Sequence, residues 1–158
     1  MEKRLKDHLE KYKIEYKSHA HPPVFTVEES KELKKNIPGL HTKSLFLKDE
    51  NGKFYLISMK ADKRLDIKSL RSTLNVRKLH FASPEELKAE LKLTPGSVSV
   101  FGMIYASSNT KLILDEAVWN AKIVNFHPNI NTATLELTHN EFKKFYDSIK
   151  KEKSVIQL

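Results

Sequence analysis

The chain has 158 residues, a length typical of one domain with its own core. Hydrophobic residues make up 39% of it and charged residues 30%, and no apolar run approaches the roughly 18 residues of a membrane span. The absence of cysteine excludes disulfides, thiolate catalysis and sulfur-ligated zinc. Because the stretch from Met1 to Glu10 is charged, we expect no signal peptide, no membrane association and a cytoplasmic location.

The formal net charge is +8, and much of it is concentrated in one segment. Between Lys60 and His80 the chain carries seven Lys and Arg residues against two Asp residues. A concentrated patch fits a phosphate backbone better than an even spread of charge, so we expect a nucleic-acid partner. The ordinary alternative is a solvated lysine-rich surface. The residues expected to contact the backbone are Lys60, Lys63, Arg64, Lys68, Arg71, Arg77 and Lys78.

Five segments show the spacing or the capping residues of helices. The first predicted helix is amphipathic, runs through Leu5, Leu9 and Tyr12, and is stopped by His21-Pro22-Pro23; the second runs from a capping box at Thr26 to Glu29 as far as Ile37. The third runs through Ile67, Leu70 and Leu74, and the fourth starts at Ser83-Pro84. The fifth is capped by Thr138 and Glu141 and has Phe142, Phe145 and Ile149 on its buried face. The last of these is expected to be the final element of the chain.

Apolar and polar residues alternate in the remaining segments, as in strands. Lys43 to Lys48 and Phe54 to Met59 flank a turn at Asp49 to Gly52, which predicts a hairpin. Further strands are predicted at Val76 to Phe81, Val98 to Tyr105, Lys111 to Leu114, Lys122 to Phe126 and Thr132 to Leu137. The layout favours a single α+β domain over residues 1–158, with helices packed around a mixed sheet.

The common catalytic motifs are missing from the sequence. It contains no G-x-S-x-G elbow, no phosphate-binding P-loop and no G-x-G-x-x-G. His19-x-His21 could touch a metal, but no third ligand is near in the sequence. We therefore expect neither a metal nor a cofactor.

Three short segments could carry chemistry. By strand parity Lys43 shares a face with Leu45 and Leu47, which would place its ammonium at the rim of an apolar pocket. There it could hold a phosphate or a developing oxyanion, whereas the alternative is a lysine that reaches water from a strand end. The loop from Pro95 to Gly102 holds two glycines and two serines and could cradle an oxyanion or a ribose. Asn125 to Thr132 gathers polar groups that suit a hydroxyl-rich ligand, although both segments are also compatible with ordinary turns.

At these segments the sequence resembles the YbaK/ProX-like aminoacyl-tRNA deacylases, which are related to the editing domain inserted in bacterial prolyl-tRNA synthetases. Within that group it is most similar to the free-standing alanyl-tRNA(Pro) deacylases. The matching stretches run in the family's order along nearly the whole chain. They are Pro22 to Glu29, Lys43 to Asp49, Phe81 to Glu85, Pro95 to Ser99, Leu114 to Ala117, Asn125 to Pro128 and Asn131 to Thr134.

The resemblance implies a YbaK-like fold, with a mostly antiparallel, barrel-like sheet of about six to seven strands. It also implies that Lys43 is the essential catalytic lysine and that the second helix flanks the pocket mouth. The residues expected at the ester, the adenosine or the pocket wall are Phe25, Val27, Ser44, Gly96, Ser97, Val98, Ser99, Phe101, Gly102, Asn125, His127, Asn131 and Thr132. One departure is Val100, which stands where the family loop usually has proline and is expected to loosen the loop.

The function implied is trans-editing: hydrolysis of the aminoacyl ester of mischarged tRNA, foremost Ala-tRNA(Pro). With no nucleophile or metal in view, we expect Lys43 to act as an electrostatic anchor, loop N–H groups to stabilise the oxyanion, and the substrate's ribose hydroxyl to orient water. The expected partners are the acceptor end of mischarged tRNA and, in addition, prolyl-tRNA synthetase or an elongation factor. Open alternatives are a deacylase for Cys-tRNA(Pro) or another small misacylation, a non-catalytic tRNA-binding module and, last, a generic basic RNA-binding domain.

Overall fold

The computed structural model describes residues 1–23 and 27–158. Predictions that concern Phe25, Thr26 and the side chain of Val27 therefore lie outside the described residues. Within the described parts of the chain, no helix is long and apolar enough to cross a membrane.

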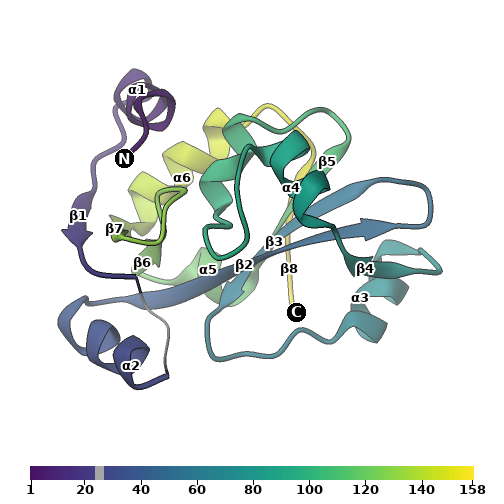
Figure 1. The fold of residues 1–158 in the computed structure, drawn as a ribbon, viewed down its shortest axis with the longest axis horizontal. Coiled ribbons are helices and arrows are strands. Elements are labelled where there is room, and N and C mark those ends of the chain that lie inside the picture. Colours follow the sequence, from purple (N-terminus) through teal and green to yellow (C-terminus); the bar gives the residue numbers. More distant parts are fainter. Residues whose placement is uncertain (24–26) are drawn as a thin grey trace.

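Strands and helices alternate along the chain (Figure 1). The helices are α1 (Lys3–Lys11), α2 (Val27–Asn36), α3 (Ile67–Leu74), α4 (Pro84–Leu91), α5 (Glu116–Asn120), α6 (His139–Ser148) and the 3-10 helix η1 (Val100–Ile104). The strands are β1 (Lys17–Ala20), β2 (Leu40–Asp49), β3 (Phe54–Lys60), β4 (Leu79–Phe81), β5 (Thr110–Asp115), β6 (Ile123–Phe126), β7 (Ala133–Thr138) and β8 (Lys153–Ile156). The five predicted helices and the predicted hairpin are confirmed.

Over the described residues the strands form one eight-stranded sheet in the order β1-β7-β6-β2-β3-β5-β8, with β4 paired to β2. The β2–β6, β3–β5 and β5–β8 pairs are parallel and the other pairs are antiparallel. The mixed, mostly antiparallel α+β class is thus confirmed. The expected barrel-like closure is wrong, because β1 and β8 end the sheet at opposite sides and do not pair with each other.

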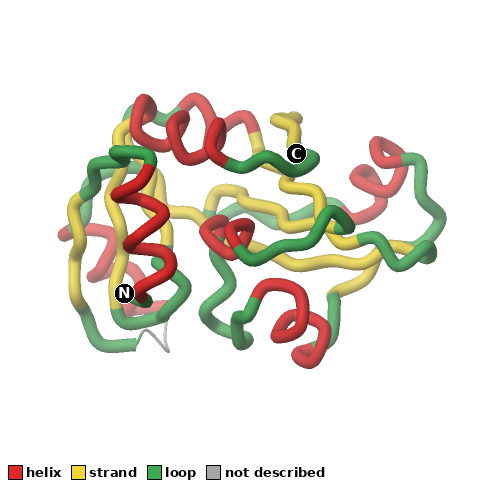
Figure 2. The backbone as a smooth tube through the Cα atoms, turned by 90° about the horizontal axis from the view of Figure 1, so that it is seen from above, coloured by secondary structure: helices red, strands yellow, loops and turns green. Residues whose placement is uncertain are grey.

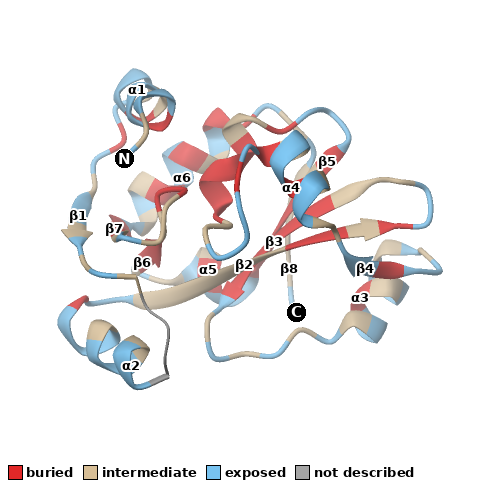
Figure 3. Cartoon of the chain, in the orientation of Figure 1, coloured by how far each residue is buried: buried red, intermediate tan, exposed pale blue. Residues whose placement is uncertain are grey.

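The β2–β3 hairpin separates two apolar clusters, because successive side chains of a strand point to opposite faces. On one face Phe46 and Leu56 join the larger cluster, together with Leu91 of α4 and Phe101 of η1. On the other face Leu47, Ile57 and Leu45 pack with residues of α3. Helices accordingly lie on both sides of the strands in Figure 2, and the buried residues in Figure 3 gather in the central strands and η1.

The prediction of a strand over Val98 to Tyr105 is wrong. Val100–Ile104 forms η1, and its first four residues, Val100 to Met103, are all buried. Ser99 starts this helix, because its Oγ accepts a hydrogen bond from the N–H of Phe101 at 3.1 Å. A continuous apolar run shows no period, so the sequence could not separate a buried strand from a buried turn of helix.

Three smaller corrections concern the two ends of the chain and one short internal helix. The first helix ends at Lys11, before Lys13 with its positive φ of 54°, and β1 lies between it and His21-Pro22-Pro23. The helix α6 is not the last element, since β8 follows and pairs with β5. The short α5, directly after β5, was not predicted.

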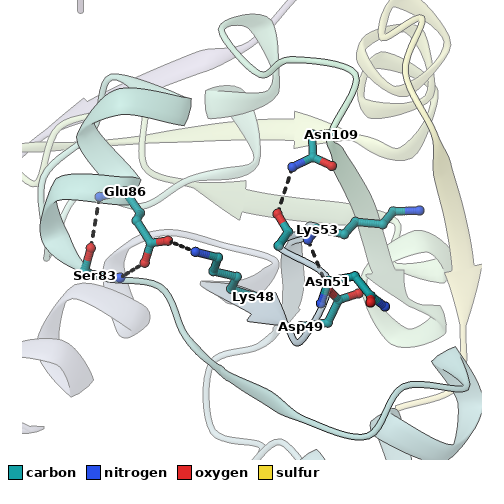
Figure 4. A network of polar contacts seen from close by, with 8 residues as sticks. Lys48, Asp49, Asn51, Lys53, Ser83, Glu86 and Asn109 are labelled. Atoms are coloured by element: carbon teal, nitrogen blue, oxygen red, sulfur yellow. Dashed lines mark hydrogen bonds and ion pairs between the residues drawn. The ribbon is translucent and has the colours of Figure 1, made fainter.

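Side-chain bonds hold α4 and the hairpin turn in place (Figure 4). Ser83 and Glu86 form the predicted capping box at the start of α4, and Glu86 also pairs with Lys48 of β2. In the turn, one carboxylate oxygen of Asp49 accepts the N–H groups of Asn51 at 2.8 Å and Lys53 at 3.0 Å. The hairpin is therefore fixed at its tip and tied to α4.

Candidate functional site

The site begins with an unpaired stretch in the middle of β2. On the edge of β2 away from β3, β6 pairs with Leu40 and His41, and β4 pairs with Leu47 to Asp49. Between them, Lys43 to Leu45 pair with β3 on one edge, but no strand of the described chain pairs with them on this second edge. The carbonyl of Phe46 points to this edge, because it accepts the N–H of Ala82 at 3.0 Å. By strand alternation the N–H and C=O of Ser44 point to the same edge and face the gap.

Lys43 lies in a cavity of about 680 Å³ beside this gap, which we term the Lys43 cavity. It is lined by Lys43, Leu45, Arg64, Leu65, Asp66, Ile67 and Phe81. The wall is mostly apolar, and Lys43 and Leu45 lie on the same side of β2 as strand parity predicted. The elements that shape the cavity are β2, the end of β4 and the connection from β3 to α3.

The charges in the Lys43 cavity are unbalanced. Among the described residues, neither Lys43 nor Arg64 forms an ion pair or a side-chain hydrogen bond. Asp66 is already engaged, because its carboxylate caps α3 by accepting the N–H of Ser69 at 3.0 Å. The cavity therefore presents two cations that an anionic ligand could neutralise.

A second cavity, of about 220 Å³, lies next to it, between α2 and the β6–β7 part of the sheet; we term it the His127 cavity. It is lined by Ser30, Leu33, Lys34, His41, Thr42, Ala61, Asn125, Phe126, His127 and Thr134. Thr42 belongs to β2 directly before Lys43, and its hydroxyl donates to the carbonyl of Asn125 at 2.6 Å. The two cavities are thus consecutive along β2.

The His127 cavity offers hydrogen-bond acceptors. Asn125 is only 2% exposed, its amide donates to the carbonyl of Pro38 at 2.9 Å, and its Oδ1 has no partner among the described residues. Burial lowers the pKa of His127, which keeps the ring neutral near pH 7. Its Nδ1 lies 3.3 Å from the carbonyl of Ala133, so that nitrogen carries the proton and Nε2 is left as an acceptor.

The third cavity, of about 230 Å³, is termed the Gly96 cavity. It is lined by Ser44, Leu45, Phe46, Phe81, Ala82, Pro84, Leu87, Pro95, Gly96 and Val98. Gly96 adopts a φ of 88°, which favours glycine, in the turn closed by the bond from the N–H of Ser97 to the carbonyl of Thr94 at 3.0 Å. This cavity opens on the α4 side of the hairpin.

The structure therefore does not bring all the predicted site residues into one pocket. Lys43 faces the α3 side, whereas Ser44, which lines the Gly96 cavity, faces the α4 side, because adjacent residues of β2 point to opposite faces. The Lys43 and Gly96 cavities share only Leu45 and Phe81. The start of the loop from Gly96 to Gly102 thus lines another cavity than Lys43, and its expected contact with the adenosine and the ester stays a prediction.

The second half of that loop belongs to the core. Ser99, Phe101 and Gly102 are buried, and Phe101 packs edge-on against Phe126 and Phe145. These three residues therefore pack in the core, and the ligand contacts expected of them stay a prediction. Val100 is buried as well, at the first position of η1, and its expected effect on the loop stays a prediction. Of the remaining predicted residues, Ser97 and Asn131 are half-buried and Thr132 is exposed.

The basic segment divides into engaged and free cations. Lys60 lies 3.9 Å from Asp62, Lys63 lies 3.5 Å from Asp115 and also contacts the carbonyl of Leu158, and Arg71 donates to the carbonyl of Arg77 at 3.1 Å. The cationic groups without a partner among the described residues are those of Arg64, Lys68, Arg77 and Lys78.

Sequence reasoning missed several residues that line these cavities. His41, Thr42 and Thr134 belong to the His127 cavity, and Phe81 lines both the Lys43 and the Gly96 cavity. Phe81 lies in one of the stretches that carry the family resemblance, but nothing local marked it as exposed. No group of three or more His, Asp or Glu that could hold a metal occurs among the described residues.

The family model described as the aminoacyl-tRNA editing domain matches residues 21–145. The chain belongs to this family, so the predicted class, an aminoacyl-tRNA editing hydrolase, is confirmed.

Individual relatives carry more specific names. The chain is 34% identical to the prolyl-tRNA editing protein ProX of Acetoanaerobium sticklandii over 138 residues, which cover 86% of this chain and 84% of that protein. It is 33% identical over 130 residues to the prolyl-tRNA synthetase associated domain-containing protein 1 of Xenopus laevis, covering 79% of this chain and 77% of the relative. A solved structure described as a candidate trans-editing enzyme for prolyl tRNA synthetase has the same fold, with a TM-score of 0.74, 20% identity, and coverage of 98% of this chain and 95% of that one.

Proposed function

We propose that this protein is a trans-editing hydrolase that cleaves the aminoacyl ester of mischarged tRNA(Pro), with Ala-tRNA(Pro) as its substrate. The names of the relatives support the prolyl system. The observation that carries the proposal is Lys43, a cation without a partner among the described residues in a cavity beside the open stretch of β2. We further propose that residues 1–158 act as one editing domain, in the cytoplasm where aminoacyl-tRNA is used.

A second, hydrolytic site is needed because the amino-acid binding site of a synthetase has limited selectivity. A synthetase that binds proline cannot strongly exclude the smaller alanine, since a missing methylene changes the free energy of binding by only about 1–3 kcal/mol. A separate hydrolytic site that admits the small aminoacyl group removes the error. The ester is activated, so a site without a nucleophile or a metal suffices.

In the proposed mechanism Lys43 is the catalytic residue and acts as a fixed positive charge. It holds a terminal phosphate or the oxyanion that develops when water attacks the ester carbonyl. The N–H of Ser44, the next residue along β2, faces the gap and is available to the same oxyanion. The free ribose hydroxyl of the substrate orients the attacking water, and the ester oxygen leaves as the other hydroxyl.

The aminoacyl group would occupy the His127 cavity. Its ammonium needs acceptors, and the Oδ1 of Asn125 and the Nε2 of neutral His127 provide them. A buried acceptor without a partner costs free energy, which the ammonium would recover. The free cations of the basic segment, Arg64, Lys68, Arg77 and Lys78, would hold the acceptor stem. Prolyl-tRNA synthetase or an elongation factor could deliver the tRNA.

A panel of charged tRNAs tests the function. The parent protein should deacylate Ala-tRNA(Pro) faster than Cys-tRNA(Pro) and should leave Pro-tRNA(Pro) intact. Lys43→Ala should lose the activity, whereas Lys17→Ala, at an exposed strand lysine of β1, should keep it. Preference for Cys-tRNA(Pro) would redirect the substrate assignment. If the protein binds tRNA but deacylates none of the charged tRNAs in the panel, it is a non-catalytic tRNA-binding module instead of an enzyme.

A further inference from the structure

Phe81 is the most exposed large apolar side chain of the described residues, at 58%. It is the last residue of β4 and pairs with Leu47 of β2. Leu79, two residues earlier on the same face of β4, is buried in the cluster with α3. On this face of β4, Leu79 points into the core but the ring of Phe81 does not. Packing within the protein therefore does not explain a phenylalanine at this position.

The surroundings of Phe81 combine apolar and cationic groups. In the Lys43 cavity the ring lies among Leu45, Leu65 and Ile67, and Lys43 and Arg64 line the same cavity. No aromatic or cation–π partner covers the ring within the described chain. An exposed ring beside unpaired cations is the arrangement that binds single-stranded nucleic acid, in which a base stacks on the ring and the phosphates meet the cations.

The alternative occupant, an apolar protein surface, fits less well. It would leave the ammonium of Lys43 and the guanidinium of Arg64 without counter-charges on burial, which is costly. A nucleotide strand brings those charges together with a flat apolar face. The cavity of about 680 Å³ is large enough for a nucleoside.

We propose that Phe81 is the stacking platform for an unpaired nucleobase in the 3′ single strand of tRNA. The inference rests on the proposed function and extends it from the ester to the strand that carries it. Phe81 positions the strand, the guanidinium of Arg64 binds a flanking phosphate, and Lys43 holds the ester end of the strand. Because Phe81 also lines the Gly96 cavity, the next base of the strand has room on the α4 side of the ring.

The test uses uncharged RNA, so that it does not depend on turnover. The probes are an acceptor-stem minihelix with its four-nucleotide 3′ single strand and the same minihelix made blunt. The variants are Phe81→Leu, which keeps an apolar side chain, Phe81→Tyr, which keeps an aromatic ring, and His80→Ala as the control. His80 is the exposed neighbour on the opposite face of β4, so all three changes leave the core untouched.

Phe81→Leu should weaken binding of the overhang minihelix by about 5- to 150-fold, the range expected when a base-stacking aromatic is removed. Phe81→Tyr should bind nearly as the parent does, and His80→Ala should be unchanged. The blunt minihelix should bind equally to all four proteins. Equal binding of the overhang minihelix by the parent and Phe81→Leu would overturn the proposal.

A fluorescent variant reports the stacking directly. The parent has one tryptophan, Trp119, which packs against His139, Phe142 and Tyr146 away from the site. In Phe81→Trp a second tryptophan should be quenched by the overhang minihelix and not by the blunt one. Absence of quenching at saturating RNA would also contradict stacking. If stacking holds but the parent deacylates no charged tRNA, the proposed function fails while this inference stands.

Discussion

The ion pair between Lys48 and Glu86 should stabilise the fold by an amount that pH can reveal. The hydrogen bond from the Lys48 ammonium, with a second one from the backbone of Ser83, lowers the pKa of Glu86 from 4.5 to about 2. A change of that size corresponds to about 3 kcal/mol. The Lys48 and Glu86 side chains are 32% and 27% exposed, so solvent screening reduces the expected contribution to about 1–2 kcal/mol.

The substitution that isolates this pair is Glu86→Gln. Glutamine can still accept the N–H of Ser83 in the capping box, so only the charge is lost (Figure 4). Glu85→Gln is the matched control, because Glu85 lies in the same first turn of α4 and shares the effect of the helix dipole. At pH 7, Glu86→Gln should lower the melting temperature by about 2–8 °C, and Glu85→Gln should lower it less.

The pH dependence gives the refuting result. A carboxylate whose pKa is lowered in the folded state stabilises above its unfolded pKa, and this stabilisation is lost as the pH falls through the folded pKa. The difference in unfolding free energy between the parent and Glu86→Gln should therefore be full above pH 4.5 and shrink towards pH 2. Equal stabilities at pH 7, or a difference that is unchanged at pH 2, would show that the pair contributes nothing.

Three further predictions concern the core, the basic segment and the histidines. Gly102→Ala places a Cβ 2.9 Å from Cδ1 of Leu93 and should lower the free energy of unfolding in urea by about 1–3 kcal/mol. An unchanged urea midpoint would mean that the Leu93 side chain moves aside without cost. Neutralising Arg77 and Lys78 together should weaken tRNA binding and reduce its logarithmic salt slope by about 2, whereas an unaltered slope would remove both from the tRNA contact. Burial lowers the pKa of His127, so the unfolded state binds more protons than the folded state. The unfolding free energy should therefore fall as the pH drops from 7.5 through 6.5, and His127→Gln should reduce this fall. An unfolding free energy of the parent that does not change over this pH range would contradict the prediction.

The sequence was sufficient where local chemistry decides the structure. Ser83, Pro84 and Glu86 signal the start of α4 without reference to the rest of the chain, and the turn at Asp49 to Gly52 signals the hairpin. Parity alone placed Lys43 on the face of Leu45 and Leu47. These features depend on neighbours within a few residues, so a single sequence contains them.

The features that the sequence did not reveal depend on distant partners. Val100 to Met103 form a turn of helix that Ser99 caps, and Leu93 leaves no room for a Cβ at Gly102. An apolar run encodes neither feature. The strand β8 exists because β5 offers it an edge. Phe81 is exposed because the pairing of β4 with β2 ends at this residue. No local sequence pattern predicts where that pairing ends.

The placement of the site shows the same limit. Parity already implies that Lys43 and Ser44 point to opposite faces of β2, so a single pocket could not hold both side chains. Which helix covers which face is a tertiary fact. α3 lies over the Lys43 face and α4 over the other, and this divides the predicted site residues among three cavities.

The central claim is that the charge of Lys43 acts on the chemical step. Single-turnover deacylation of Ala-tRNA(Pro) should be measured at saturating enzyme for the parent, Lys43→Ala, Lys43→Arg and Lys17→Ala, together with the affinity of each for uncharged tRNA. The account predicts that Lys43→Ala reduces the rate about 100-fold or more with a much smaller change in affinity, that Lys43→Arg retains part of the rate, and that Lys17→Ala matches the parent. A parental rate in Lys43→Ala would contradict it.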